Sequence, residues 1–119
     1  MPIFKLSTNL PANKLPAGFA DKTAEMLANS FGKPIAYVAV QVVTDQIISW
    51  GGTDSGPCGL ATVESTDGLG SDQNKKHSKA IADHLDKELG IGSDKCYIIF
   101  VDIDKVNLGY MGTTSDELF

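Results

Sequence analysis

The second residue of the chain, Pro2, is the first candidate for chemistry. An initiator methionine is normally removed when a small residue follows it, and proline would then carry a free secondary amine. A neutral amine near pH 7 is a suitable base for taking a proton from the carbon next to a carbonyl group. Model α-amino groups have a pKa of about 7.7–8.0, and an apolar pocket or a nearby cation favours the neutral form. The alternative is that Pro2 only favours an extended start to the chain.

The second candidate is Lys33, in the sequence Gly32-Lys33-Pro34. Its ammonium group is suited to binding a substrate carboxylate or stabilising an enolate oxygen. It is also a cation that would lower the pKa of the Pro2 amine. The alternative is a lysine at the C-terminal end of a helix, where it complements the helix dipole.

Other reactive side chains form no recognisable site. His77 and His84 share one helical face, but no further Cys or His completes a zinc set, so we expect solvated helix residues. The glycine pairs at 51–52 and 68–70 lack the spacing and the lysine of a phosphate loop and are typical of turns. The acidic pair in 102–104 falls where a strand ends, so we interpret it as a turn.

The composition excludes several classes of protein. A length of 119 residues with 42% hydrophobic residues predicts one globular domain, residues 1–119. The net charge of -5 leaves no basic surface for nucleic acid, and the cluster 75–79 is interpreted as the solvated start of a helix. No apolar run is long enough for a membrane span, and the start of the chain has no signal peptide. With Cys58 and Cys96 interpreted as buried free thiols, we expect a cytoplasmic protein.

The chain repeats one order of elements twice. The first unit consists of a strand at 3–8, a helix with Pro16 near its first turn and Gly32 as its C-cap, and a buried strand at 35–44. The second consists of a strand at 58–65, a helix capped by Ser71 or Asp72 and ended by Gly90, and a strand at 96–101. Matching residues support a duplication: Leu27, Gly32, Tyr37 and Val38 correspond to Leu85, Gly90, Tyr97 and Ile98.

Two tandem β-α-β units predict an α+β fold with a four-stranded mixed sheet and two helices on one face. The other face of such a sheet is uncovered, which favours a homo-oligomer. We expect the segments 50–52 and 108–110 to form short edge strands that extend neighbouring sheets.

These residues together resemble the macrophage migration inhibitory factor and D-dopachrome tautomerase family, within the tautomerase superfamily. The resemblance covers nearly the whole chain and rests on the order of many short segments. They are Met1-Pro2, Thr8-Asn9-Leu10-Pro11, Pro16-Ala17-Gly18-Phe19, Gly32-Lys33-Pro34, Tyr37-Val38-Ala39-Val40, Gly51-Gly52, Pro57-Cys58, Gln73-Asn74, Leu89, Tyr97-Ile98, and Gly109 with Thr113. Residues 8–18 are closer to the D-dopachrome tautomerase branch and residues 97–102 to the other, so both subgroups stay open.

The resemblance implies a homotrimer with one site at each subunit interface, and an activity that needs no metal or organic cofactor. It implies that Pro2 is the catalytic base and that Lys33 binds the acidic end of a small aromatic keto acid. Further pocket residues implied in the same way are Ser65, Thr66, Tyr37, Leu108, Tyr110, and Tyr97 from the neighbouring subunit.

Several positions depart from the family pattern. Ile99 stands where an asparagine is often found, which removes a partner for a substrate hydroxyl, and Thr66 makes the pocket wall more polar than isoleucine. Cys58 is followed by no second cysteine at the required spacing, which argues against thiol–disulfide oxidoreductase activity. The loop 67–70 and the tail 115–119 also differ, and either is able to alter the rim of a trimer.

Two functions follow from this resemblance. The first is a keto–enol tautomerase acting on phenylpyruvate- or dopachrome-type substrates, with Pro2 as the general base. The second is a secreted, cytokine-like ligand of a cell-surface receptor with a weak or vestigial pocket, since family members leave cells without a signal peptide. The intact pair of Pro2 and Lys33 favours the enzyme.

Overall fold

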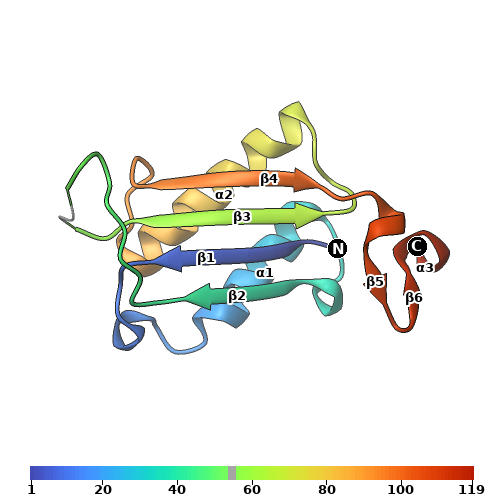
Figure 1. Cartoon of the computed structure of the whole chain (residues 1–119), viewed down its shortest axis with the longest axis horizontal. Helices are drawn as coiled ribbons and strands as arrows, with labels where there is room; N and C mark the ends of the chain where they lie inside the picture. Colours follow the sequence, from blue (N-terminus) through green and yellow to red (C-terminus); the bar gives the residue numbers. More distant parts are fainter. Residues whose placement is uncertain (54–55) are drawn as a thin grey trace.

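A four-stranded mixed sheet forms the centre of the molecule. The computed structural model describes residues 1–53 and 56–119, and its strands lie in the order β2-β1-β3-β4 (Figure 1). β1 (Ile3–Thr8) pairs in parallel with β2 (Ala39–Val43), and β3 (Gly59–Ser65) pairs in parallel with β4 (Cys96–Asp102). The two central strands, β1 and β3, are antiparallel. The mixed sheet and the two repeated units are therefore confirmed.

Two helices cover one face of this sheet. α1 (Phe19–Phe31) and α2 (Ser71–Leu89) pack side by side behind it (Figure 1). The core between the two layers contains the apolar residues Phe4, Leu6, Phe19, Leu27, Phe31, Ala61, Val63, Ile81, Leu85, Leu89 and Ile91. The alternation of β1 and the helical spacing of α1 predicted these buried positions, because each pattern places its apolar side chains on one side.

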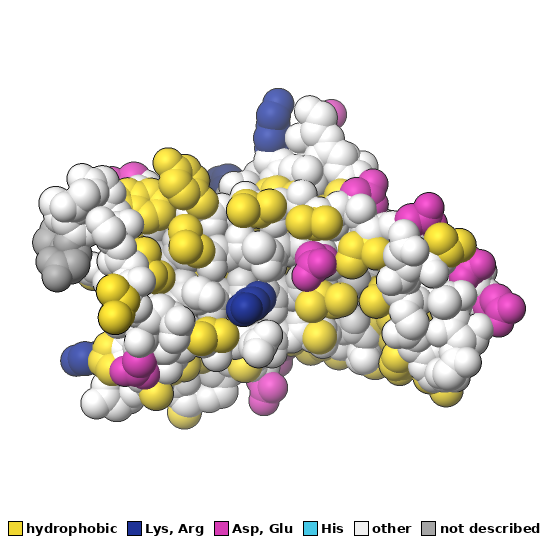
Figure 2. Space-filling view, in the orientation of Figure 1, with side chains coloured by type: hydrophobic (Ala, Val, Ile, Leu, Met, Phe, Trp, Pro, Cys, Tyr) yellow, Lys and Arg dark blue, Asp and Glu magenta, His cyan; other side chains and the backbone are white. Residues whose placement is uncertain are grey.

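The opposite face of the sheet is open. Leu60, Tyr97 and Ile99 are 47%, 68% and 58% exposed on it. Figure 2, viewed from this side, shows apolar side chains spread over the strands among a few charged ones. An exposed apolar face of this kind is typical of a surface that meets another subunit.

The N-terminal and C-terminal segments of the chain lie close together. The first residues of β1 and β2 and the last residues of β3 and β4 lie at the same end of the sheet (Figure 1). A C-terminal segment lies beside this end of the sheet, and it contains a short hairpin followed by a short helix. Its elements are β5 (Gly109–Tyr110), β6 (Thr113–Thr114) and α3 (Ser115–Leu118). The start of the chain is thus next to its end.

Three predictions about local structure are wrong. The expected strand over 35–44 begins only at Ala39, because residues Ile35–Tyr37 form a 3-10 helix in which the amide of Tyr37 donates to Pro34. β2 is also an edge strand and is half exposed rather than buried. The N-cap of α2 is Gly70, so Ser71 is already helical and Asp72 lies in the first turn.

The expected edge strands are present only in part. Gly109–Tyr110 forms β5, which pairs with β6 of its own hairpin. Trp50 forms an isolated bridge with Thr53. Their extension of a neighbouring sheet stays a prediction.

The histidines of α2 are not solvated as expected. His77 is 2% exposed, and its ring stacks on Phe31 with the ring centres 3.9 Å apart. His84 is half buried and makes a hydrogen-bonding contact of 2.9 Å with the Thr23 hydroxyl. The lysines at 75, 76 and 79 are exposed, as predicted for a solvated helix start.

Candidate functional site

Pro2 lies directly before the central strand β1, at the end of the sheet where the two termini of the chain come together. Its side chain is fully buried, and its carbonyl oxygen accepts a hydrogen bond of 3.2 Å from the amide of Ala39. This bond continues the pairing of β1 with β2 and fixes the position of the proline. The predicted base is therefore placed by the sheet itself.

Lys33 reaches the same place from the end of α1. Gly32 ends the helix in a left-handed conformation with φ 63°, which glycine adopts without strain. The chain turns there, and the Lys33 ammonium forms an ion pair of 3.0 Å with the Asp67 carboxylate. The predicted C-cap glycine thus directs the predicted cation toward the start of the chain.

Asp67 connects these two groups, and the sequence analysis assigned it no role in the site. One carboxylate oxygen lies 3.0 Å from the Lys33 ammonium and the other 3.3 Å from the Met1 amine. Burial raises the pKa of Asp67, but the hydrogen bond from Lys33 and the charge of the terminal amine outweigh it, so the pKa lies below its ordinary value. The available signal for a role of Asp67 in the site is its position directly after the predicted pocket residue Thr66. In the sequence, the loop 67–70 stands out only as a departure from the family pattern.

The loop that carries Asp67 is fixed at two points. The Ser65 hydroxyl, which is fully buried, donates a hydrogen bond of 2.6 Å to the Asp67 carbonyl oxygen. Gly68 has φ +76°, and a Cβ there would lie 2.8 Å from the Phe31 ring. His77 holds the Gly68 carbonyl oxygen through a contact of 2.8 Å. Ser65 therefore supports the loop that carries Asp67. It does not line either of the two cavities beside Met1 that are described next.

Two cavities lie on either side of Met1. The first has a volume of about 310 Å³ and is lined by Met1, Lys33, Pro34, Tyr37, Thr66, Asp67, Lys105 and Phe119. The second has a volume of about 230 Å³ and is lined by Met1, Ile3, Ala36, Tyr37, Val38, Ala39, Leu108, Gly109 and Tyr110. Met1 and Tyr37 line both of them. Five of the predicted residues, Lys33, Thr66, Tyr37, Leu108 and Tyr110, therefore surround the terminal residue.

Aromatic rings form one wall of this region. Tyr37 lies between Phe119 and Tyr110, with ring centres 5.1 and 6.3 Å away in edge-to-face arrangements. Both partners come from the C-terminal segment. The Lys105 ammonium approaches the Phe119 carbonyl oxygen at 3.4 Å. Lys105 and Phe119 were not predicted, because they reach the cavity only through the fold of the tail.

Tyr97 and Ile99 lie elsewhere in this chain. Both are on the open face of the sheet, beside a hollow of about 360 Å³ that Leu60 and Thr62 also line. In β4, Tyr97 lies roughly 16 Å along the strand from Asp102, at about 3.3 Å per residue, while Asp102 pairs with Ser65 near the site. This chain alone does not bring them to the cavities beside Met1, and their part in the site stays a prediction.

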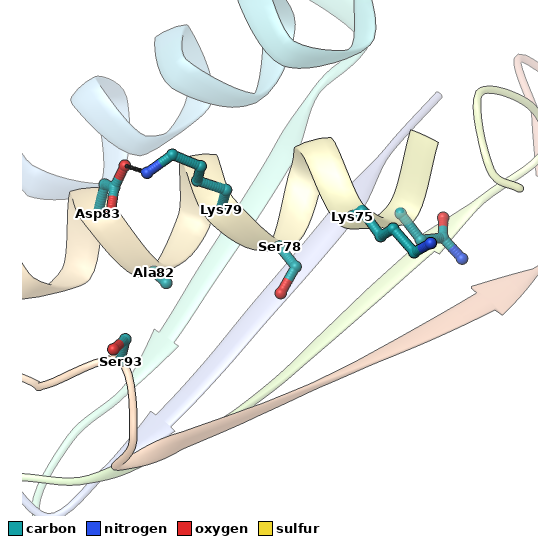
Figure 3. Close-up of a pocket in the computed structure, with 7 residues that line it drawn as sticks. Lys75, Ser78, Lys79, Ala82, Asp83 and Ser93 are labelled. Atoms are coloured by element: carbon teal, nitrogen blue, oxygen red, sulfur yellow. Dashed lines mark hydrogen bonds and ion pairs between the residues drawn. The ribbon is translucent and has the colours of Figure 1, made fainter. Parts of the chain in front are cut away.

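Another hollow lies apart from this site. It measures about 580 Å³ and lies between α2 and the loop before β4, where Ser93 faces the helix (Figure 3). Its charged side chains include Lys79 and Asp83, which form an ion pair of 3.0 Å. It is an open, polar surface groove, so we place the candidate site at the smaller cavities beside Met1, where the predicted residues gather.

The two cysteines show no redox pairing. Both are free. Cys58 is buried as predicted, but Cys96 is only partly buried, so the prediction of two buried thiols is wrong for Cys96. Burial raises the pKa of Cys96 to about 11, with the nearby Cys58 adding to the effect. A thiol with so high a pKa is a poor nucleophile at neutral pH, in line with the broken Cys-x-x-Cys pattern.

Comparison with known proteins decides the family. The model of the family described as macrophage migration inhibitory factor (MIF) matches residues 1–116. The chain belongs to the MIF family. A curated MIF homologue from Trichinella spiralis is 40% identical over 96% of this chain and 99% of its own length. MIF from Rattus norvegicus is 39% identical over 96% of this chain and 98% of its own length.

Solved structures of the MIF family share the fold described above. The structure of MIF from Trichinella spiralis has a TM-score of 0.90 and 38% sequence identity, covering 94% of this chain and 98% of that chain. The MIF structure from Oncomelania hupensis, with a TM-score of 0.91 at 23% identity, shows likeness of fold alone. Both the recognised family and the α+β architecture are therefore confirmed.

Within residues 1–53 and 56–119, no helix is both long and apolar enough to cross a membrane. No group of three or more His, Cys, Asp or Glu side chains in those residues is arranged to hold a metal ion.

The pairing of Asp67 makes the stability of the protein dependent on pH. Because the pKa of Asp67 is lower in the folded state than in the unfolded chain, its stabilising effect is complete above about pH 4 and is lost as the pH falls through the folded pKa. The side chain is 35% exposed, so we expect Asp67→Asn to cost less than about 1 kcal/mol at pH 7. Urea unfolding of both proteins at pH 7 and pH 3 checks this. A difference that is equal at both pH values contradicts it.

Proposed function

We propose that this MIF-family protein is a keto–enol tautomerase, an isomerase in which Pro2 acts as the general base once Met1 has been removed. The observation that carries the proposal is that Pro2 is fully buried and that Met1, which is bonded to the Pro2 nitrogen, lines both cavities. Removal of Met1 would join the two cavities and leave the secondary amine of Pro2 between them. A base is useful only where a substrate fits beside it, and this arrangement supplies both.

The proposed reaction is a transfer of one proton. The neutral amine of Pro2 takes a proton from the carbon next to a ketone, and the electrons of that C–H bond form the enolate. The charge that develops on the carbonyl oxygen is stabilised by the cation that lines the cavity, Lys33. The proton then returns to the oxygen, which gives the enol, and no electrons leave the substrate.

The substrate class is a small aromatic carbonyl compound of the phenylpyruvate or dopachrome type. The aromatic wall around Tyr37 supports this, because aromatic rings pack well against a planar phenyl group. Thr66, Leu108 and Tyr110 line the same two cavities, and we assign them to substrate contact.

We further propose a homotrimer with one site at each subunit interface. The open apolar face of the sheet supports an association between copies of the chain. Tyr97 and Ile99 project from that face, where a neighbouring subunit would receive them. In this arrangement each site is completed by residues from two chains.

The family includes tautomerase and cytokine-like functions, so a location inside the cell and export without a signal peptide both belong to the proposal. A cell-surface receptor is then a second partner beside the small-molecule substrate. The receptor-ligand function becomes the leading one if catalysis is absent from the correctly processed protein.

The test is an assay of purified protein with both phenylpyruvate and its methyl ester, followed by the ultraviolet absorbance of the enol. Mass spectrometry must first show that Met1 is absent. We expect enzyme-dependent tautomerisation of at least one of the two compounds. If the processed protein accelerates neither, the tautomerase proposal is wrong.

A further inference from the structure

We propose that Asp67 is the counterion of the Pro2 amine in the processed chain, where it stabilises the protonated amine and opposes the effect of the Lys33 ammonium. The inference rests on the proposed tautomerase function and deepens it, because it names a residue that tunes the base. Asp67 acts through Pro2, so it is a positioning residue rather than a catalytic one.

The first argument is the distance between Asp67 and the Pro2 nitrogen. One carboxylate oxygen of Asp67 lies 3.3 Å from the amine of Met1. The nitrogens of two adjacent residues are at most about 3.7 Å apart, because only the Cα and the carbonyl carbon lie between them. The carboxylate is therefore no more than about 7 Å from the nitrogen that becomes the terminal amine when Met1 is removed.

The second argument is that Asp67 stays in place when Met1 is removed. Its other carboxylate oxygen lies 3.0 Å from the Lys33 ammonium, and the buried Ser65 hydroxyl donates to its carbonyl oxygen at 2.6 Å. Neither contact involves Met1. The pKa of Asp67 lies below its ordinary value, so the carboxylate is ionised over the whole range in which an amine titrates.

The third argument concerns the other charges around the amine. The titratable side chains that line the two cavities beside Met1 are Lys33, Tyr37, Asp67, Lys105 and Tyr110. A phenol carries no charge at neutral pH. On the surrounding elements, the acidic residues Glu64, Asp102, Asp104, Asp116 and Glu117 are exposed. Among the described residues that line these cavities, Asp67 is thus the one acidic group, and it faces two lysines.

This arrangement suits the proposed reaction. The Pro2 amine becomes a cation when it takes the proton of the substrate, and a nearby carboxylate stabilises that cation. Lys33 alone would favour the neutral amine and make it a weaker base. Asp67 offsets this effect, so the base keeps the strength that removal of a proton next to a carbonyl requires.

The experiment measures the protonation of Pro2 directly and apart from turnover. Processed protein containing ¹³C-labelled proline is titrated by NMR from pH 5 to pH 10. The chain has five prolines, and only Pro2 has an amine after loss of Met1, so its ring carbons alone report an amine titration. The rising limb of the pH profile of kcat/KM for phenylpyruvate, which reports the pKa of the free base, is measured in parallel.

The variant is Asp67→Asn, which keeps the size of the side chain and removes its charge. We expect the pKa of the Pro2 amine to fall by about 0.5–1.5 pH units, because the ammonium loses a carboxylate at about 7 Å or less. The rising limb of kcat/KM moves to lower pH by the same amount. Lys33→Met removes the opposing charge, and we expect it to raise the pKa of the amine.

A matched control is available on α2. Asp83 also forms an ion pair of 3.0 Å with a lysine, Lys79, but it lies at the separate polar groove in Figure 3. Asp83→Asn makes the same change in net charge away from the site. We expect it to move the pKa of Pro2 by less than about 0.2 units, since charges separated by more than a Debye length are screened.

Three results overturn the inference: an unchanged pKa of Pro2 in Asp67→Asn, a raised one, and an equal shift in Asp83→Asn. A lower pKa in Lys33→Met contradicts the opposition of the two charges and overturns it as well. The expected shifts without any turnover have a different meaning. They support Asp67 as the counterion of the amine and refute the proposed tautomerase function.

Discussion

Replacement of Pro2 by glycine is expected to lower kcat/KM for tautomerisation by about 10²–10⁴-fold, the range that a positioned general base contributes. Glycine at the processed N-terminus still has an amine, but it lacks the ring that fixes the direction of the nitrogen lone pair. Glycine also has the greatest backbone freedom, so the base would lose its fixed geometry. The assay is the same ultraviolet measurement, with loss of Met1 shown by mass for both proteins.

A matched control for Pro2→Gly is Pro34→Ala. Pro34 lines the cavity of about 310 Å³ beside Met1, but its nitrogen belongs to a peptide bond and is not basic. We expect Pro34→Ala to retain kcat/KM within about threefold. Equal losses in both variants, or nearly full activity in Pro2→Gly, would show that Pro2 is not the base. Unfolding in urea must be alike for wild type and Pro2→Gly, so that a loss of activity is not a loss of fold.

The sheet and its helices were predictable from sequence because their patterns are local. β1 alternates apolar and polar residues, and α1 has Phe19, Leu27 and Phe31 on one face before Gly32. Such patterns record which side of an element is buried, and this depends little on distant residues. The two β-α-β units followed from repetition of the same order along the chain.

The segment 35–44 shows where local patterns are insufficient. Its Ile, Val and Tyr content favours a strand, yet Ile35–Tyr37 forms a 3-10 helix directly after Pro34. The correspondence of Tyr37 with Tyr97 therefore holds in sequence but not in structure, since Tyr97 lies within β4. Residues with high strand propensity adopt other conformations where pairing is not available.

The residues of the candidate site that were predictable from the sequence are those that lie within or next to the family motifs. Pro2 and Lys33 belong to segments that carry the resemblance, and Thr66 was placed by its position in the family pattern. The fold brings Lys33 and Thr66 to one cavity with Met1, the residue bonded to Pro2. The pairing of Lys33 with Asp67 joins the segment just after α1 to the loop after β3, and no sequence pattern encodes such a contact. Family resemblance could not supply it either, because the loop 67–70 departs from the family.

The buried histidine of α2 was missed for a similar reason. In sequence, His77 lies among lysines and has the surroundings of a solvated residue. In the structure, its partners come from α1 and from the loop before α2, so its burial depends on tertiary packing. Charged neighbours on a helix indicate an exposed face only for residues that share that face.

Replacement of His77 by phenylalanine is expected to lower the free energy of unfolding by about 2–4 kcal/mol. His77 Nε2 donates to the Gly68 carbonyl oxygen at 2.8 Å, since a carbonyl only accepts, and Nδ1 then accepts from the Ser30 hydroxyl at 2.6 Å. Phenylalanine preserves the stacking on Phe31 but removes both nitrogens. The buried Ser30 hydroxyl and the half-buried Gly68 carbonyl oxygen would lose their partner, at a cost of roughly 1–3 kcal/mol for the buried group and less for the other.

His84→Phe is the matched control, because His84 lies on the same helix and also stacks on a phenylalanine, Phe19. It is half buried, and its partner Thr23 has another hydrogen bond, to the Phe19 carbonyl oxygen at 2.8 Å. We expect a loss below about 1 kcal/mol, measured by urea unfolding at one fixed protein concentration. Equal losses for the two variants would refute a special role for His77. A larger loss for His77→Phe would show that the contacts of His77 with Ser30 and Gly68 stabilise the fold.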